Sequence, residues 1–185
     1  MSAREVILRT PRLTLRNWRE TDREPFAALH ADPEVMQDLG GPIDRAASDA
    51  KLDRYIAALR THGFARLAIE DGRGALAGYA GIMRRDQGPP LGPHVEVGWR
   101  LARAAWGKGY ATEAATAALR DVFDRTGLTE VISYTSPDNR RSQAVMARLG
   151  LQRDPARDFT LPGGWHGLVW VARLSSPQAW QAPRR

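Results

Sequence analysis

The most constraining feature of this sequence is a change of hydrophobic period near the middle of the chain. Val95, Val97 and Trp99 alternate with polar residues and glycine, the period of two that is typical of a half-buried strand. From Ala111 onward the apolar residues recur at the spacing of a helix. The change of period falls on a glycine-rich turn at residues 106–110. The sequence therefore predicts a strand, a loop and a helix in that order.

The loop has the composition of an anion-binding turn. Gly107 and Gly109 reach backbone conformations that are closed to other residues, and they let a ligand approach main-chain atoms. The first N–H groups of the following helix lack partners within the helix and lie at the positive end of its dipole. This combination favours phosphate or pyrophosphate. A glycine pair before a helix is also common without a ligand, so on these residues alone both interpretations stay open.

Residues 106–114 read W-G-K-G-Y-A-T-E-A and resemble the acetyl-CoA-binding motif of the GNAT superfamily of N-acetyltransferases, usually written Q/R-x-x-G-x-G/A. Trp106 takes the place of the usual glutamine or arginine, and this form is typical of the RimJ/RimL-type branch. The resemblance covers roughly residues 10–174 and implies a single N-acetyltransferase domain over residues 1–185, with a C-terminal tail that is expected to be loose. It implies an α+β fold, with a mixed central sheet of about seven strands, splayed after the fourth and flanked by about four helices.

The pattern along the chain predicts strand, two helices, three strands, helix, strand, helix and two strands. The expected strands are residues 12–18, 64–70, 76–83, 95–100, 130–135, 159–161 and 168–174. The expected helices are residues 21–31, 44–61, 111–126 and one opened by residues 137–139, with a short helical or irregular link at 34–41. Thr21 and Glu24 have the spacing of a capping box, and residues 71–74 have the composition of a hairpin turn.

The resemblance also implies where acetyl-CoA binds. Main-chain groups at the strand end, in Trp99, Arg100 and Leu101, are expected to hydrogen-bond the pantetheine arm. The loop residues expected to contact the cofactor, with the pyrophosphate on their main-chain N–H groups, are Trp106, Gly107, Lys108, Gly109, Tyr110, Ala111 and Thr112. Lys108 either adds a point charge or is a solvent-facing loop lysine.

A second motif, N-R-R-S at residues 139–142 followed by L-G-L at 149–151, resembles the family's N-x-x-S/A-x-x-x-Y/L-x-x-x-G-F/L pattern. The Asn139 amide offers a donor and an acceptor to the pantetheine arm, and a helix cap is the alternative interpretation. Many members place a tyrosine acid where this chain has Met146, which cannot donate a proton. The resemblance therefore implies that Ser142 assists the departing thiolate; the alternative is an ordinary helix residue.

Glu96 is the expected general base, because family members often carry a catalytic glutamate at this strand position. The amine must lose a proton, since an ammonium has no lone pair for the thioester carbonyl. The alternative for Glu96 is a solvent-facing strand carboxylate. His166 is a further acceptor-site candidate, and His30 and His62 are expected at the surface, at helix ends.

The composition excludes several other kinds of site. The chain has no cysteine, no histidine spacing of a metal site and no G-x-S-x-G nucleophile elbow. No metal is therefore expected, and acetyl is expected to pass directly from acetyl-CoA to a primary amine. A dinucleotide oxidoreductase would need G-x-G-x-x-G within βαβ repeats, which the chain lacks. A non-catalytic, CoA-binding or regulatory module stays open as an alternative, because the usual tyrosine acid is missing.

Charge and hydropathy bear on partners and location. The net charge is +6, but the basic residues are scattered among acids, so nucleic acid is not an expected partner. No apolar run is long enough to span a membrane and the N-terminus lacks a signal-peptide core, so a cytoplasmic protein is expected. The acceptor is left open between a protein N-terminus and a small amine such as an amino acid, a polyamine or an antibiotic. Trp165, Trp170 and Trp180 leave a homodimer open.

Overall fold

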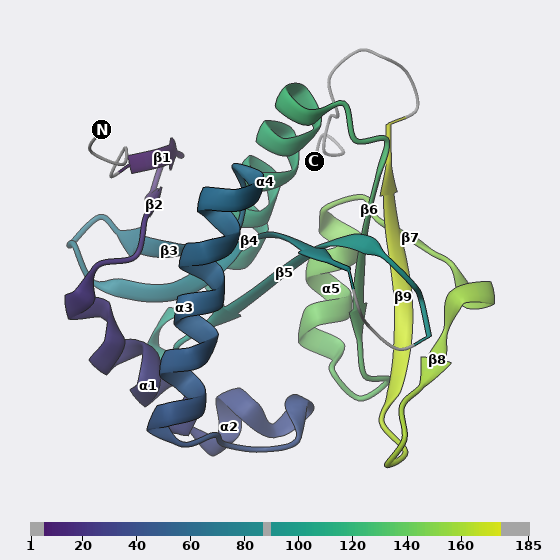
Figure 1. The fold of residues 1–185 in the computed structure, drawn as a ribbon, viewed down its shortest axis with the longest axis horizontal. Helices are drawn as coiled ribbons and strands as arrows, with labels where there is room; N and C mark the ends of the chain where they lie inside the picture. The colour runs from purple at the N-terminus through teal and green to yellow at the C-terminus, as the bar shows by residue number, and fades with distance from the viewer. Residues whose placement is uncertain (1–5, 87–89, 175–185) are drawn as a thin grey trace.

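The computed structural model describes residues 6–86 and 90–174, which form a mixed β-sheet with helices on both faces (Figure 1). The strands are β1 (Val6–Arg9), β2 (Leu13–Arg16), β3 (Arg66–Asp71), β4 (Leu76–Arg85), β5 (His94–Leu101), β6 (Glu130–Thr135), β7 (Gln152–Arg153), β8 (Phe159–Thr160) and β9 (His166–Arg173). The α-helices are α1 (Arg23–Ala31), α2 (Pro33–Met36), α3 (Arg45–His62), α4 (Tyr110–Thr126) and α5 (Arg140–Arg148). Short 3-10 turns are η1 (Glu20–Asp22), η2 (Gln37–Leu39), η3 (Arg103–Ala105) and η4 (Pro155–Arg157).

The sheet has the strand order β1-β2-β3-β4-β5-β6-β9-β7, and β8 pairs with β9. The neighbouring strands run antiparallel except β5 and β6, which are parallel. β4 pairs with β5 from Gly78 to Arg85, whereas β5 and β6 meet only at Glu96 and Ile132. Beyond that pair Figure 1 shows β5 running away from β6. The mixed sheet and its splay are confirmed. The splay was expected after the fourth strand, at residues 95–100, and this strand is β5 because β1 precedes the first expected strand.

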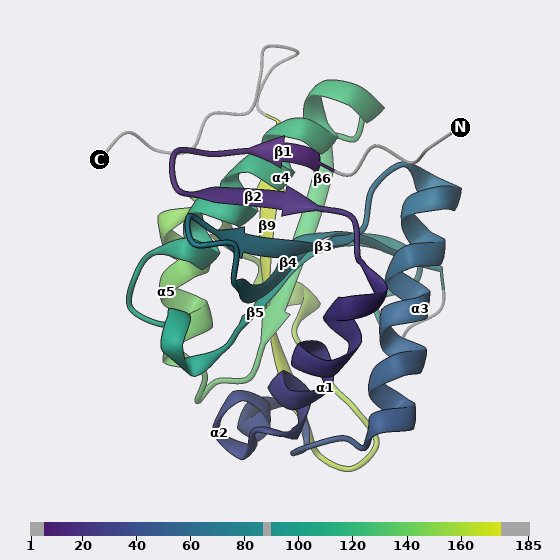
Figure 2. The ribbon, with the colours of Figure 1, turned by 90° about the vertical axis from the view of Figure 1, so that its left-hand side faces the viewer.

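The helices divide between the two faces of the sheet (Figures 1 and 2). α4 and α5 cover one face, and α1, α2 and α3 cover the other. On the first face, Ala114, Ala115 and Ala118 of α4 are buried, and the α4 alanines pack with Ile82 and Val97. These small side chains let α4 lie close to β4 and β5. The glycine loop at the start of α4 is thereby held beside the end of β5.

Aromatic residues fill the space between the other face and helices α1 and α3. Phe26, Tyr55 and Tyr79 are at most 5% exposed and form one cluster. Their ring centroids lie 6.1, 5.6 and 5.4 Å apart, at the tilted or edge-on angles that aromatic rings prefer. His30 is fully buried beside them, 4.3 Å from the Phe26 ring. The expectation that His30 lies at the surface is therefore wrong: position 30 follows Phe26 by one turn and shares its buried face.

Two strands and one cap differ from expectation. β1 was not expected because residues 6–8 are continuously apolar and lack the alternation of a strand, and β7 has only two residues.

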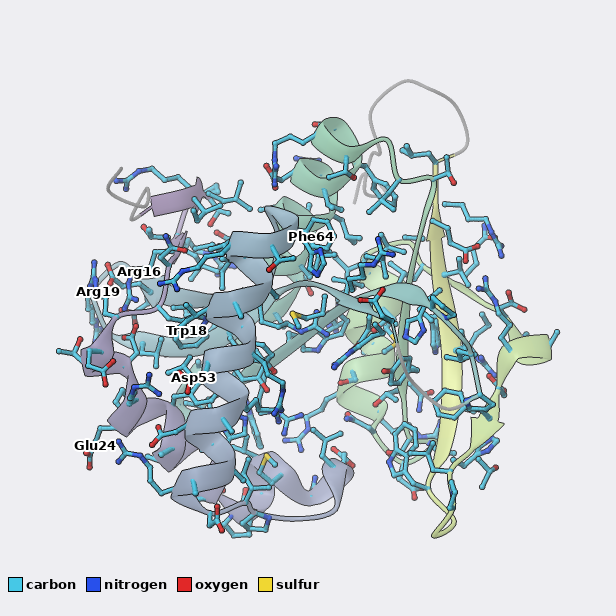
Figure 3. All side chains as sticks on the ribbon, viewed as in Figure 1. Arg16, Trp18, Arg19, Glu24, Asp53 and Phe64 are labelled. Atoms are coloured by element: carbon cyan, nitrogen blue, oxygen red, sulfur yellow. The ribbon has the colours of Figure 1, made fainter. Side chains whose placement is uncertain are left out.

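The expected capping box of Thr21 and Glu24 is wrong, because the chain enters α1 through η1 and Asp22 points inward. The Asp22 carboxylate accepts from Arg16, which is 3% exposed, at 2.7 and 3.0 Å. The buried guanidinium needs this partner, and Glu24 extends instead from the outer side of α1 (Figure 3).

None of the helices in the described part of the chain is long and apolar enough to cross a membrane.

The expected loose tail and Trp180 lie outside the described residues. Of the other two tryptophans considered for a dimer surface, Trp165 packs on Tyr134 within the chain, and Trp170 lies under the Arg153 guanidinium. The homodimer stays a prediction.

Candidate active site

The glycine loop has the backbone conformation that its sequence predicts. Gly107 and Gly109 have φ angles of +75° and +78°, in the left-handed region that favours glycine. Gly109 is the N-terminal cap of α4, and its carbonyl oxygen accepts from the Glu113 N–H. The N–H groups of residues 110–112 have no acceptor within the helix. They lie at the positive end of a 17-residue helix, which suits an anion.

Arg12, just before β2, holds the loop in place. Its guanidinium donates to the Lys108 carbonyl oxygen at 2.7 Å and to the Glu113 carboxylate at 2.6 Å. The Thr10 hydroxyl donates to the same carboxylate, also at 2.6 Å. Because the C=O and N–H of a trans peptide point in opposite directions, the Gly109 N–H points away from Arg12. Arg12 therefore orients one of the loop donors, a role that the sequence did not predict.

Trp106 and Arg141 join the loop to the start of α5. The Trp106 indole N–H donates to the Leu101 carbonyl oxygen at 2.9 Å, which ties the loop to the end of β5. The Arg141 guanidinium lies over the Trp106 ring, 3.8 Å from its centroid, in a cation–π contact. The contact connects the β5 side of the splay with the α5 side.

The end of β5 has one edge without a strand partner. After Glu96, no residue of β5 pairs with β6 in the described part of the chain. Arg100 and Leu101 pair with Tyr79 and Gly78 of β4 on the other edge. Main-chain groups of β5 that face the splay therefore lack the hydrogen bonds of a sheet. One of them, the Leu101 carbonyl oxygen, accepts from the Trp106 indole instead. A role for Trp99, Arg100 and Leu101 in binding pantetheine stays a prediction that fits this edge.

Asn139 and Ser142 lie together at the start of α5. The Asn139 side-chain oxygen accepts the Ser142 N–H at 3.0 Å, so Asn139 is a helix cap. Its contact with pantetheine stays a prediction. Ser142 is half-buried in the first turn of α5, whereas Met146, one turn later, is 1% exposed in the core. The proton-donor role of Ser142 is likewise a prediction.

Glu96 is a buried, ion-paired carboxylate, not the solvent-facing one of the alternative interpretation. It is 8% exposed, and its two oxygens lie 2.7 Å from Arg66 Nη2 and 2.8 Å from Arg85 Nε. The Tyr134 hydroxyl donates to it at 3.2 Å. Burial by itself raises the pKa of the Glu96 carboxyl, but Arg66 and Arg85 outweigh it and hold the pKa below its usual range. Burial and the neighbouring Glu96 charge raise the pKa of Tyr134.

Gly98 makes room for the arginine that pairs with Glu96. A Cβ atom at Gly98 would lie 2.5 Å from Arg66 Nη2. Arg66 also donates to the Gly81 and Glu96 carbonyl oxygens, so its guanidinium lies flat across β4 and β5. Gly98, two residues after Glu96, thus makes space for the Arg66–Glu96 ion pair. A glycine at this strand position is the one local signal in the sequence of a large side chain crossing β5.

The histidines take different places. His94 directs Nδ1 to the Gly92 carbonyl oxygen at 2.8 Å, and its buried Nε2 has no partner in the described residues. His166 is exposed on β9 and contacts the Thr160 hydroxyl at 3.0 Å. Within residues 6–86 and 90–174, no three or more His, Asp or Glu side chains group in a way that could hold a metal ion.

A splayed parallel strand pair beside a glycine-capped helix start with free N–H groups is typical of acyl-CoA-dependent acyltransferases. Residues 12–152 match the family described as Acetyltransferase (GNAT) domain. The chain therefore belongs to the GNAT superfamily, and it is an acetyl-CoA-dependent acetyltransferase.

Similar proteins agree with this membership. An acetyltransferase structure from Agrobacterium tumefaciens is 34% identical with a TM-score of 0.77, covering 90% of this chain and 94% of that one. The uncharacterized protein YkkB of Bacillus subtilis is 30% identical over 77% of this chain and 83% of its own length. FsC-acetyl coenzyme A-N(2)-transacetylase of Aspergillus fumigatus is 46% identical over only 56 residues, 30% of this chain and 24% of that protein. RimL, a ribosomal alpha-N-protein acetyltransferase solved with coenzyme A, shares the fold at 17% identity, with a TM-score of 0.71 over 92% and 98% of the two chains.

Proposed function

We propose that this protein transfers the acetyl group of acetyl-CoA directly to a primary amine. The observation that carries the proposal is the glycine loop at the start of α4. Its free N–H groups lie beside the unpaired edge of β5. The coenzyme A held by RimL and the N-transacetylase named among the relatives support the same chemistry. Membership of an acetyltransferase family argues against the alternative of a non-catalytic, CoA-binding module.

Each part of the cofactor has a proposed place. The pyrophosphate binds the main-chain N–H groups of Gly107, Lys108, Gly109, Ala111 and Thr112. The pantetheine arm lies along residues 99–101 of β5 and reaches the Asn139 amide. The thioester then lies in the splay, between β5 and the start of α5.

The reaction needs a neutral amine and a leaving thiolate. The amine nitrogen bonds to the acetyl carbonyl carbon, the C–S bond breaks, and the proton lost by nitrogen is balanced by the proton that the sulfur gains. We assign Ser142 to the thiolate and Glu96 to the amine proton, the latter through water because arginines occupy both carboxylate oxygens. The lowered pKa makes Glu96 a weak base, so positioning supplies much of the rate.

Calorimetric titration of acetyl-CoA tests the proposal. The native chain is expected to bind, and Gly109→Glu is expected to abolish binding, because it adds a negative charge and a side chain at a positive φ. Gly74→Glu is the matched control, since Gly74 has a φ of +79° in a turn where an added Cβ would meet nothing within 4 Å. Release of CoA thiol with a panel of amines and N-terminal peptides then measures transfer. Unchanged binding by Gly109→Glu, or thiol release that no amine accelerates, would contradict the proposal.

A further inference from the structure

The face of the sheet under α2 and α3 carries more positive charge, on buried and half-buried side chains, than its acids neutralise. Arg66 and Arg85 share one carboxylate, that of Glu96. No ion pair between described residues includes either of two further cations on this face, Lys51 of α3 and Arg100 of β5. Figures 1 and 2 show that α2 and α3 lie on the same side of the sheet, opposite α4.

Arg100 has donors that the protein leaves without an oxygen acceptor. It pairs in register with Tyr79 across β4 and β5, so both side chains lie on the α2–α3 face. One of its terminal nitrogens contacts the sulfur of Met36, a weak acceptor, and its buried Nε has no partner in the described part of the chain. Buried guanidinium donors are normally satisfied. The Arg100 guanidinium therefore has donors that an acceptor from outside the chain would satisfy.

Lys51 lies one turn before Tyr55 on α3, so the two side chains share a face of the helix. The Tyr55 ring lies 5.4 Å from that of Tyr79, the register partner of Arg100. Lys51 is half-buried, and burial lowers its pKa, with the Arg100, Arg54 and Arg85 charges lowering it further while Tyr79 opposes them. The Arg100 and Lys51 charges in turn lower the pKa of the buried Tyr79 hydroxyl against the effect of burial. Two uncompensated cations thus lie within electrostatic reach of each other, a repulsion that an anion between them would relieve.

His30 and the carboxylates of the α2 segment do not supply that anion. Tyr79 contacts His30 Nε2 at 3.3 Å, and burial, with a contribution from Lys51, lowers the pKa of His30 to about 4, so His30 is neutral at pH 7. Asp32 and Glu34 of the α2 segment are both paired with Arg103.

We propose that Lys51 and Arg100 bind an anionic group, a carboxylate or a phosphate, carried by the amine that accepts the acetyl group. The proposal rests on the proposed function. Arg100 belongs to the strand end whose main chain is assigned to pantetheine, so an anion held by its side chain places the acceptor next to the thioester. The substrate class is therefore a small primary amine with an anionic substituent. Polyamines and other cationic acceptors are disfavoured by the same charges.

Matched acceptor pairs test the proposal. The values of kcat/KM are measured for glycine against glycinamide, the carboxylate arm, and for phosphoethanolamine against ethanolamine, the phosphate arm. In the native enzyme, at least one anionic member is expected to be preferred. Lys51→Met and Arg100→Met are each expected to lower that anionic-to-neutral ratio by about tenfold or more, the loss of one charge-assisted bond. Comparing ratios between variants cancels the difference in amine basicity within a pair.

Arg60→Met is the matched control, because Arg60 is an exposed cation on the same helix as Lys51. It is expected to leave the ratio unchanged, and thermal unfolding of each variant checks that its fold is intact. Preference of the native enzyme for both neutral members, or a ratio that Lys51→Met leaves unchanged, overturns the proposal while amine acetylation stands.

A binding measurement separates this proposal from the proposed function. Phosphoethanolamine and glycine are titrated by calorimetry into the CoA-loaded native enzyme and into Lys51→Met. Binding that depends on Lys51 supports the anion site even if no amine is acetylated, in which case the proposed function fails alone. Absence of binding by both compounds, together with absence of charge preference in turnover, overturns the anion site.

Discussion

Glu96 shows how strongly the chemistry of one side chain depends on residues distant in the sequence. Its strand position indicated a catalytic carboxylate, but its neighbours Arg66 and Arg85 come from β3 and β4. Those charges keep the carboxylate ionised against the effect of burial. The residue is therefore suited to holding β3, β4 and β5 together, and its proposed assistance to the amine would be that of a weak base.

Glu96→Gln tests both roles at once. We expect kcat to fall by about 100-fold, the lower end of the scale of general-base assistance because Glu96 is a weak base, with little change in KM for acetyl-CoA. We also expect the free energy of unfolding to fall by about 3 kcal/mol, because the buried Arg66 guanidinium and the half-buried Arg85 guanidinium lose their charged partner. Steady-state kinetics and urea unfolding measure the two effects. Ser142→Ala, which removes no ion pair, is the comparison: a lower kcat with unchanged stability is expected for it.

If Glu96→Gln loses stability but keeps its kcat, Glu96 is structural only. The pH profile gives an independent check. Because the pKa of Glu96 lies below its usual range, the rise of native kcat/KM near neutral pH is expected to follow the pKa of the acceptor amine. A rise that stays at one pH for amines of different basicity would contradict this.

At the scale of elements, the loop and the helix after it were predictable because their signals are local. Two glycines with positive φ and a run of small residues at helical spacing specify the turn, the cap and the buried face of α4. Arg12 was not predictable, since its contacts with Lys108 and Glu113 cross from the start of β2 to α4. The prediction of a capping box at Thr21 and Glu24 is wrong for a similar reason. The Asp22 carboxylate, at the start of α1, accepts from Arg16 of β2 and caps no N–H group of the helix.

Arg12→Met tests how far this contact orients the loop. We expect KM for acetyl-CoA to rise by about tenfold, because the Lys108 carbonyl loses its charged donor and the Gly109 N–H is less well oriented. The value of kcat should change much less. Arg9→Met is the control, since it removes an exposed cation from the neighbouring strand β1. Equal KM values for the two variants would show that Arg12 does not position the loop.

At the scale of the whole molecule, the two faces of the sheet differ in the kind of side chain that they bury. The α4 face is an apolar core composed mainly of alanine, valine and leucine, with Ile82, Phe123 and Met146. The opposite face combines an aromatic cluster with buried His30, Arg66 and Glu96. Buried titratable groups link the stability of the fold to pH.

His30 gives this linkage a sign and a range. Its pKa in the folded protein is about 4, chiefly through burial, against about 6.5 in an unfolded chain. The unfolded state therefore binds more protons between these values, and stability is lost as the pH falls through this range. We expect the free energy of unfolding to fall by about 3 kcal/mol between pH 7 and pH 4, measured by urea unfolding.

His30→Gln should flatten this pH dependence, although it lowers stability at pH 7 by disturbing the packing on Phe26. His62→Gln, a histidine at the end of α3, should keep the native pH dependence. A slope that His30→Gln leaves as steep as in the native chain would assign the pH dependence to other groups.

The sequence by itself determined the strand, the glycine loop and the helix after it, because their signals are adjacent or periodic along the chain. Its two motifs are also local, and their resemblance to the GNAT superfamily implied the fold, the splay and acetyl-CoA. Only the tertiary structure decided the charge environment of the sheet face under α2 and α3. Lys51, Arg66, Arg85 and Arg100 lie on four separate elements, and nothing in their spacing shows that they converge on one surface. Charges interact through space, so their balance is known only when packing brings those elements together.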